Sequence, residues 1–258
     1  LLVDAISAAE QCVYLETQYF SSQRIFGALA SRMEAADRPK LQIVVVVNER
    51  AEAVKEELAV GLRQAEIIEK LREVAPATGH ALGVYWSRPA GKPDPFPSTY
   101  IHSKVTIVDD RFLSVGSANL TNRSRGVDTE LHASWEASPD ETSSELIRRI
   151  RDIRVSLLAE HSGYEGDANE AFGPVHDLVA RLDAIADRSR LRKLGPPSPA
   201  QRAALDLLDP QSLPFDPADP GAEDAAAWDE PSDQRQRGRI ASRITSAKTW
   251  VARKWPGR

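Results

Sequence analysis

The chain has 258 residues, 41% of them hydrophobic, and a formal net charge of −5 at pH 7. This length and hydrophobic content suffice for a sizeable core. The longest apolar run, residues 43–47, is far shorter than the roughly 20 residues that span a bilayer. We therefore expect a soluble or peripheral membrane protein, cytoplasmic or at a membrane surface unless a missing N-terminal segment directs it elsewhere. The single cysteine, Cys12, excludes an internal disulfide.

Helical and strand-like segments alternate over the first part of the chain. The pattern of apolar residues predicts helices over 1–11, 22–36 and 53–74, and strands over 13–20, 41–48 and 81–86. The continuous apolar run in 41–48 is typical of a strand buried on both faces. A loop rich in proline and glycine, 88–99, comes next. This order predicts an α/β fold with a layered, mixed β-sheet flanked by helices.

Polar side chains then recur at a spacing of two. His102 and Lys104 would share one face of an extended strand. Ser117 and Asn119 repeat that spacing on the next apparent strand, and a third strand-like run carries Glu130. Two short strands could thus present four polar groups to one phosphate.

These residue types suit the cleavage of a phosphodiester without a metal ion. One imidazole can attack phosphorus while a second protonates the leaving alcohol, and donors such as Lys104, Ser117 and Asn119 can hold the non-bridging oxygens. A carboxylate must orient the imidazole through its other ring nitrogen, and we expect Glu130 to orient His102. Because the five histidines lack companion ligands at metal-binding spacing, we expect neither a metal nor another cofactor.

The pattern His102-x-Lys104-x-x-x-x-Asp109, followed by Gly116-Ser-Ala-Asn119 and Glu130, resembles the HKD motif of the phospholipase D superfamily. The segment Val13-Tyr-Leu-Glu-Thr-Gln-Tyr-Phe20 resembles the strand that opens the second half of two-motif members. Alternation along that strand puts Glu16 and Gln18 on one face, so both are candidates for substrate contact. The resemblance covers residues 1–165, which we take as a catalytic half.

Members of that family use two HKD motifs across a pseudo-twofold axis, and this sequence holds one. The resemblance therefore implies the second, C-terminal half of a two-motif enzyme, in keeping with a chain that starts at Leu1 rather than at methionine. The alternative is a complete single-motif chain that pairs with a second copy of itself. By the family's habit, His102 would be the general acid/base, and the phosphohistidine would form on the other half. The motif also places Asp109 in the catalytic set, although its place after a strand suggests that it ties the turn 109–111.

The composition changes beyond the motif strands. Residues 138–141 are typical of a helix start, and an apolar stripe predicts that this helix ends near Gly163; the stripe is Leu146, Ile150, Ile153 and Leu157. A helical extension is expected over 166–194, with a helix from Val175 to Leu194. Residues 195–258 are proline-rich, then acidic, then basic, so we expect a largely irregular tail. Within it, 239–255 predicts a short amphipathic helix that contacts a membrane, docks on the protein or stays solvated.

The distribution of charge bears on the substrate. Acidic and basic residues balance in the tail, so residues 1–194 hold the net charge of −5, whereas a non-specific nuclease gains affinity from a basic groove. By the resemblance we expect a phosphodiesterase or phosphatidyltransferase that acts on glycerophospholipid through a phosphohistidine. The alternatives are a metal-independent nuclease that works as a homodimer and a non-catalytic half that binds phosphate or membrane. The lipid headgroup and the acceptor, water or an alcohol, stay open.

Overall fold

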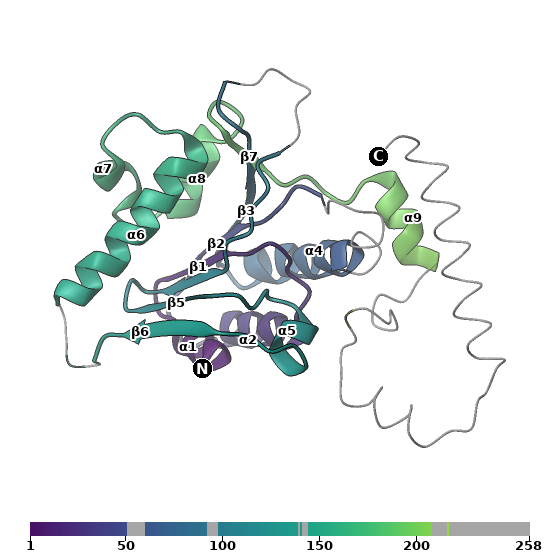
Figure 1. The fold of residues 1–258 in the computed structure, drawn as a ribbon, viewed down its shortest axis with the longest axis horizontal. Helices are drawn as coiled ribbons and strands as arrows, with labels where there is room; N and C mark the ends of the chain where they lie inside the picture. Colours follow the sequence, from purple (N-terminus) through teal and green to yellow (C-terminus); the bar gives the residue numbers. More distant parts are fainter. Residues whose placement is uncertain (51–59, 92–97, 139, 141–143, 208–215, 217–258) are drawn as a thin grey trace.

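The computed structural model describes residues 1–50, 60–91, 98–138, 140, 144–207 and 216. Within these residues a mixed β-sheet lies between two groups of helices, which confirms the predicted α/β class (Figure 1). None of the helices in these ranges is long and apolar enough to cross a membrane.

The sheet of the described residues has seven strands in the order β6-β5-β4-β1-β2-β3-β7. The strands are β1 (Cys12–Glu16), β2 (Gln42–Val46), β3 (Ala81–Ser87), β4 (Val105–Val108), β5 (Phe112–Gly116), β6 (His132–Glu136) and β7 (Leu191–Lys193). The central strands β1, β2 and β3 are parallel, and the outer pairings are antiparallel. The end of β1 therefore lies at the same edge of the sheet as the start of β4.

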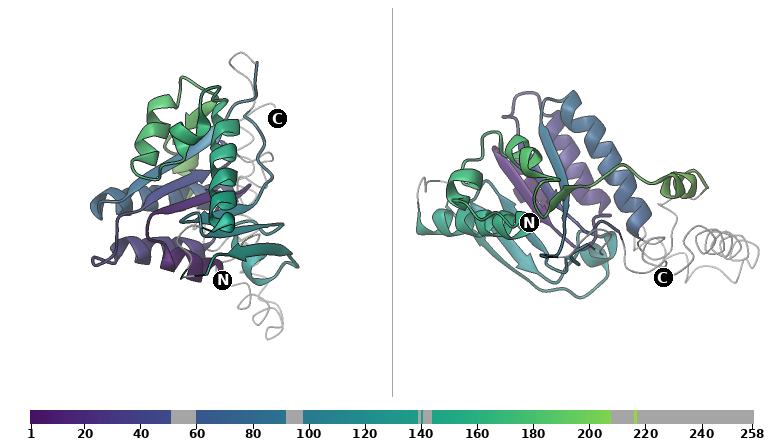
Figure 2. Two further views of the ribbon diagram at one scale, coloured as in Figure 1. Left: turned by 90° about the vertical axis from the view of Figure 1, so that its left-hand side faces the viewer. Right: turned by 90° about the horizontal axis from the view of Figure 1, so that it is seen from above.

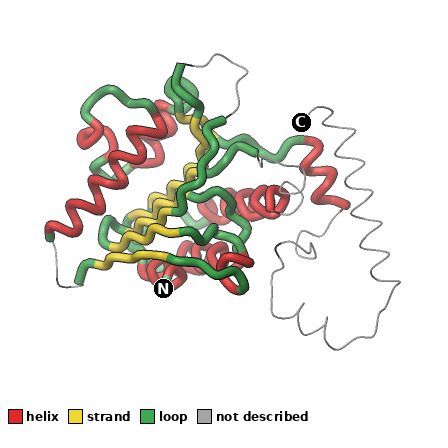
Figure 3. Tube along the Cα trace, in the orientation of Figure 1, coloured by secondary structure: helices red, strands yellow, loops and turns green. Residues whose placement is uncertain are grey.

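Helices cover both faces of this sheet, as Figure 2 and the tube drawing in Figure 3 show. One face packs against α1 (Leu2–Ala8), α2 (Gln23–Glu34) and α4 (Leu62–Ala77). The other packs against α6 (Glu145–Ser162), α7 (Ala168–Phe172) and α8 (Leu178–Ile185). The short α5 (Asn122–Gly126) follows β5, and α9 (Pro199–Leu207) contacts α4.

Successive side chains of β2 belong alternately to the two hydrophobic cores, one on each face of the sheet. Ile43 and Val45 belong to the core under α1, α2 and α4, whereas Val44 and Val46 belong to the core under α6, α7 and α8. All four side chains are fully buried. The prediction of a strand buried on both faces is thus confirmed, because a β-strand directs successive side chains to opposite faces.

Helix α6 differs from its prediction at the start and along its buried face. It begins at Glu145, and its N-cap is Ser144, whose Oγ accepts a hydrogen bond from the Ile147 N–H at 3.2 Å. Its end is as predicted, because Gly163 adopts φ 62°. The expected apolar stripe is wrong at Ile153, which is 38% exposed, because the fully buried Arg154 occupies the interface beside it.

Two further segments depart from the predictions, and others cannot be compared. The expected helix from Val175 to Leu194 is wrong in its last part, because 191–193 form β7 and pair with the edge of β3. The first strand ends at Glu16 rather than Phe20. The predicted amphipathic segment 239–255 lies outside the described residues, as do parts of the expected helix start at 138–141 and of the loop 88–99.

Candidate functional site

The polar residues of the candidate site gather at one end of the sheet, where the termini of five strands lie side by side. The topology decides this, because β1, β2 and β5 end there and β4 and β6 start there. Each side chain lies just beyond a strand rather than within it, which differs from the expected two-strand display. In chain order the residues are Gln18, Asn48, His102, Lys104, Ser117, Asn119 and Glu130.

Gln18 connects the two nitrogen donors of the site. Its Oε1 accepts from Lys104 Nζ at 3.2 Å and from Asn119 Nδ2 at 3.5 Å. Its Nε2 donates to the Tyr100 hydroxyl, and the residue is 7% exposed. Gln18 thus lies in the site that the sequence pointed to, where it can fix the directions of both donors.

Lys104 is a buried cation held beside the backbone of His102. Its Nζ donates to the His102 carbonyl oxygen at 2.5 Å. Burial lowers the pKa of Lys104, and the charge of Glu130 opposes that shift. A desolvated ammonium group interacts more strongly with an anion than an exposed one does, so Lys104 is well placed to bind a phosphate.

His102 is exposed at the same edge. Its ring stacks on Tyr100 at 6.1 Å between centroids, and in the described part of the chain its imidazole makes no hydrogen bond. Glu130, expected to orient His102, instead accepts a hydrogen bond from Ser117 Oγ at 2.5 Å. The register explains this, since Gly116 of β5 pairs with His132 of β6 while β4 lies on the far side of β5.

Glu16 lies in a buried network beside the site rather than with Gln18. Its carboxylate accepts from the Tyr14 hydroxyl at 2.5 Å and from Ser103 Oγ, and it lies 3.0 Å from His161 Nε2. Burial raises the pKa of Glu16. Its contacts with His161, Ser103 and Tyr14 together outweigh burial, so the net shift of the pKa is downward. The expectation that Glu16 and Gln18 share a face is wrong, because β1 ends between them.

Asp109 lies at the opposite end of β4 from His102. Its carboxylate accepts the backbone N–H groups of Glu10, Gln11 and Cys12 at 2.7, 2.7 and 2.8 Å. Asp109 therefore anchors the start of β1 instead of tying its own turn. The structure does not bring it to the other motif residues.

Two residues that position the site, Asn48 and His132, were not predicted from the sequence. Asn48 Oδ1 accepts from Ile101 N at 2.7 Å, and its Nδ2 donates to the carbonyls of Gln18 and Ile101 at 3.2 and 3.1 Å. His132 Nε2 accepts from Ala118 N at 3.1 Å and so holds the Ser117–Asn119 loop. A signal for Asn48 was present, since a polar residue directly after a buried strand end is well placed for a site.

One residue of the acidic segment also reaches this region. Asp216 is 1% exposed and accepts from Ser21 Oγ at 2.5 Å, Asn122 Nδ2 at 3.2 Å and Arg123 N at 2.8 Å. Its carboxylate therefore joins the segment after β1 to the start of α5, next to Asn119.

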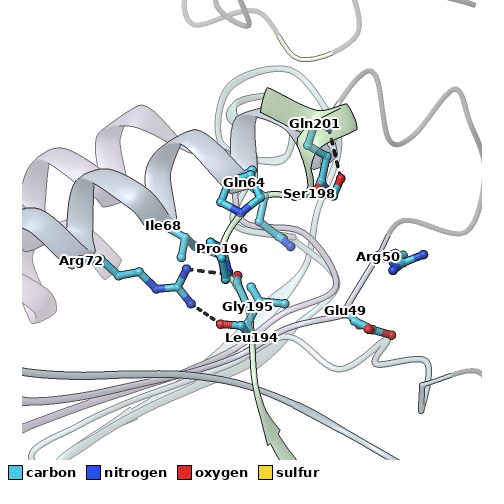
Figure 4. A pocket seen from close by; sticks show the side chains of 13 residues that line it. Glu49, Arg50, Gln64, Ile68, Arg72, Leu194, Gly195, Pro196, Ser198 and Gln201 are labelled. Atoms are coloured by element: carbon cyan, nitrogen blue, oxygen red, sulfur yellow. Dashed lines mark hydrogen bonds between the residues drawn. The ribbon is translucent and has the colours of Figure 1, made fainter. Parts of the chain in front are cut away.

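A cavity borders the site at the end of β2, where Glu49, Arg50 and Gln64 meet the segment before α9 (Figure 4). Arg72 closes one side by donating to the carbonyls of Leu194 and Gly195. Gln64 Oε1 accepts from Phe20 N at 3.1 Å, which connects this wall to the loop that carries Gln18. No group of three or more His, Cys, Asp or Glu side chains arranged to hold a metal ion occurs among the residues that the structure describes.

Comparisons with known proteins agree with the motif. The model of the family described as "Cardiolipin synthase, PLD-like domain" matches residues 2–153, more than half of the chain. Phospholipase D zeta 1 of Arabidopsis thaliana is 28% identical over 223 residues, which cover 67% of this chain and 20% of that protein. The chain thus spans about a fifth of that relative's length.

Two solved structures resemble the chain at low identity. NucT from Helicobacter pylori is 17% identical, with a TM-score of 0.43 over 62% of this chain and 86% of that one. Phosphatidylserine synthase of Haemophilus influenzae Rd KW20 is 17% identical, with a TM-score of 0.41 over 71% and 42% of the two chains.

Proposed function

Because the chain belongs to the phospholipase D superfamily, we propose that it supplies one half of an active site that cleaves the phosphodiester bond of glycerophospholipids. The product would be phosphatidate, or a new phosphatidyl ester when an alcohol is the acceptor. The observation that supports this most is the linkage of Lys104 and Asn119 through Gln18 beside the exposed His102. These groups can bind the phosphate and serve the proton transfer.

The proposed reaction is two displacements at phosphorus. An imidazole of the second half attacks phosphorus, the bond to the leaving alcohol breaks, and His102 gives its proton to the leaving oxygen. In the second step water or an alcohol gives its proton to His102 and attacks phosphorus, and the P–N bond breaks. One histidine cannot serve both as nucleophile and as acid, because the two approach phosphorus from opposite sides.

The donors hold the non-bridging oxygens during both steps. Lys104 and Asn119 face the same end of the sheet, and Ser117 joins them once its single O–H turns from Glu130 to the phosphate. Removing one such donor from an active site typically costs about 2.7–4 kcal/mol of transition-state stabilisation. Asn119 Nδ2 carries two N–H groups, and Gln18 Oε1 accepts one of them at 3.5 Å. The second N–H remains to donate to a phosphate oxygen.

The second half would dock on the exposed face of β5 and β6. Val115, Leu131 and Trp135 are 40%, 80% and 46% exposed there, and alternation puts them on one face. Exposed apolar side chains beside a polar site are typical of an interaction surface. The second half would be an upstream HKD half or a second copy, and it would also supply the carboxylate that orients His102.

Lipid is preferred over nucleic acid because of the charge. Residues 1–194 carry the whole net charge of −5, which opposes the approach of a polyanion. Peripheral membrane contact through 239–255 forms part of the proposal. A metal-independent nuclease is the competing outcome of the test.

The test compares the monomeric chain with the self-associated chain and with the chain joined to an upstream half that carries a second motif. Each is sized in solution and assayed on phosphatidylcholine, phosphatidylglycerol and a plasmid, with and without a primary alcohol and after exhaustive chelation. We expect no activity from a monomer of the chain alone, and metal-independent formation of a phosphatidyl-alcohol once a second motif is present. Turnover should fall by about 10²- to 10⁴-fold in His102→Ala and stay unchanged in His176→Ala, a histidine that is exposed on the surface.

Three results would contradict the proposal. An active monomer would exclude the two-histidine mechanism, and normal turnover by His102→Ala would exclude the assigned acid/base. A dimer that nicks the plasmid and ignores lipid would establish the nuclease instead.

A further inference from the structure

We propose that a second cavity, between the β5–β6 edge of the sheet and helices α1, α2 and α5, binds a phosphate group. The cavity is about 260 Å³ and is lined by Arg24 of α2, Arg125 of α5, three polar side chains of the sheet and four apolar residues, Leu1, Leu2, Val3 and Ile25. The three polar side chains are Ser114, His132 and Ser134. The inference does not depend on the proposed reaction, because none of these residues takes part in it.

The positive charge of this cavity is not balanced by its lining. The side chains of Arg24 and Arg125 make no hydrogen bond and no ion pair with any residue in the described ranges, and the lining contains no Asp or Glu. Arg24 is exposed to solvent, whereas Arg125 is partly buried. Burial lowers the pKa of Arg125, and the charge of Glu130 opposes that shift. A partly buried guanidinium without a partner is unfavourable, and a bound anion would stabilise it through charge-assisted hydrogen bonds.

The sheet contributes donors whose directions can be derived. Because Ala118 N donates to His132 Nε2 at 3.1 Å, the ring proton lies on Nδ1, which donates to Ser114 Oγ at 3.1 Å. Ser114 Oγ also accepts from Ser134 Oγ at 3.0 Å. With both acceptor sites of Ser114 used, its own O–H remains to donate into the cavity.

His132 connects this cavity to the loop of the candidate active site. The same ring that lines the cavity holds Ala118, which lies between Ser117 and Asn119. A Cβ on Gly116 would lie 2.3 Å from the Leu131 carbonyl oxygen and 2.6 Å from His132 Cγ, so glycine lets the start of β6 approach the loop this closely. A ligand bound in the cavity would therefore change the position of the loop that carries Ser117 and Asn119.

Two charged groups act on His132, namely Arg125 of α5 and Glu130 before β6, and Arg24 of α2 lines the same cavity. Burial and the charge of Arg125 lower the pKa of His132, while Glu130 opposes them. A bound phosphate would neutralise the arginines and raise that pKa. Protonation would remove the acceptor for Ala118 N–H, which gives a readout that a purely structural role would not move.

The test uses the full chain carrying Lys104→Met and Asn119→Ala, so that phosphate cannot report on the candidate active site. Inorganic phosphate is titrated by calorimetry, and the His132 ring is followed by NMR. We expect one remaining site, an affinity about tenfold or more weaker after Arg24→Gln or Arg125→Gln, and a higher His132 pKa with phosphate. Arg148→Gln, an exposed arginine of α6, should change nothing.

A second arm identifies the source of the phosphate. The same variants are floated with vesicles of phosphatidylcholine alone and with added phosphatidic acid, whose headgroup is a phosphomonoester. Binding to phosphatidic acid that depends on Arg24 but occurs without binding of free phosphate identifies a lipid headgroup, and binding of free phosphate identifies a soluble ligand. The proposal is overturned if neither binds, or if both arginine variants, with unchanged thermal unfolding, bind as tightly as the parent.

Discussion

At the scale of single residues, the neutral amides of Gln18 and Asn48 fix the position of the charged Lys104 and of the backbone around it. Gln18 orients Lys104 and Asn119 through one oxygen, and Asn48 binds the carbonyl of Gln18 and both the N–H and the carbonyl of Ile101. Such amides fix geometry without competing for the charge of a phosphate. Precise placement matters here, because catalysis by positioned donors depends on directions set before the substrate binds.

Replacing Gln18 by leucine tests this arrangement. Gln18→Leu keeps a similar volume but removes the shared acceptor, and a hydrogen bond to a charged group is worth about 1.5–3 kcal/mol. We expect kcat to fall about ten- to hundredfold in the assembled enzyme, measured on lipid vesicles. Gln11→Leu, at an exposed position before β1, is the matched control. Equal kcat values for the two variants would rule out an orienting role for Gln18.

At the scale of elements, a buried ion pair fastens α6 to the sheet. Arg154 Nε lies 2.7 Å from Asp110 Oδ1, and its guanidinium also donates to the carbonyls of Phe172 and Gly173 at 2.7 and 3.0 Å. The pair thus joins α6, the β4–β5 turn and the end of α7. His161 at the last turn of the same helix meets Glu16 beside the site, so this fastening also places part of the candidate site.

Breaking the ion pair should destabilise the fold strongly. Asp110→Asn suits the left-handed backbone at φ 57° but leaves Arg154 as an unpaired buried charge. We expect a loss of about 3–5 kcal/mol in the free energy of unfolding, measured by denaturant titration. Glu145→Gln, which breaks the exposed pairs with Arg148 and Arg149, should leave the free energy of unfolding close to that of the wild type. Adding Arg154→Met should restore part of the loss, and no restoration would refute the charge explanation.

A second connection between elements runs through Asp216. Asp216→Ala would leave the buried Ser21 hydroxyl without its acceptor and would remove the carboxylate that accepts from Asn122 Nδ2 and Arg123 N. We expect a loss of about 1–3 kcal/mol in the free energy of unfolding, the usual cost of an unsatisfied buried polar group. Asp206→Ala, an exposed aspartate of α9, is the control. Identical denaturation midpoints would mean that Asp216 does not fasten these loops.

At the scale of the whole molecule, an uncovered apolar surface on β5 and β6 lies beside the site at the strand ends. The strand β6 is the edge strand there, and its side chains are largely exposed. Helices α6, α7 and α8 leave this part of the sheet open (Figure 1). A second half bound there would complete the site with another histidine and cover the apolar side chains.

Leu131→Asp tests that surface. Leu131 is 80% exposed, so the substitution should leave the unfolding midpoint unchanged while a buried charge weakens association with the second half. We expect sedimentation to show less association, with activity on lipid lost in parallel. Leu207→Asp, at a leucine of α9 that is 69% exposed, should behave as the wild type. Wild-type assembly by Leu131→Asp would place the interface elsewhere.

The sequence by itself determined most of the elements and several of the side chains that gather at the end of the sheet, among them Gln18, Lys104 and Asn119. The apolar run of β2 and the glycine after α6 were predictable because strand burial and helix ends depend on neighbouring residues. The spacing of Lys104, Ser117 and Asn119 also indicated that one phosphate could meet all three. Residue types at fixed local spacings suffice for such predictions.

Only the tertiary structure decided which side chains are partners. Glu130 meets Ser117 rather than His102 because β5 separates β4 from β6, and a spacing along the chain does not contain that strand order. Arg154 replaces Ile153 in the core because Asp110, 44 residues away in sequence, neutralises it there. Asp109 likewise accepts hydrogen bonds from the backbone at the start of β1, the strand next to β4. Partnership depends on which distant groups the fold brings within hydrogen-bond distance, and that is a property of the packed sheet and not of any segment.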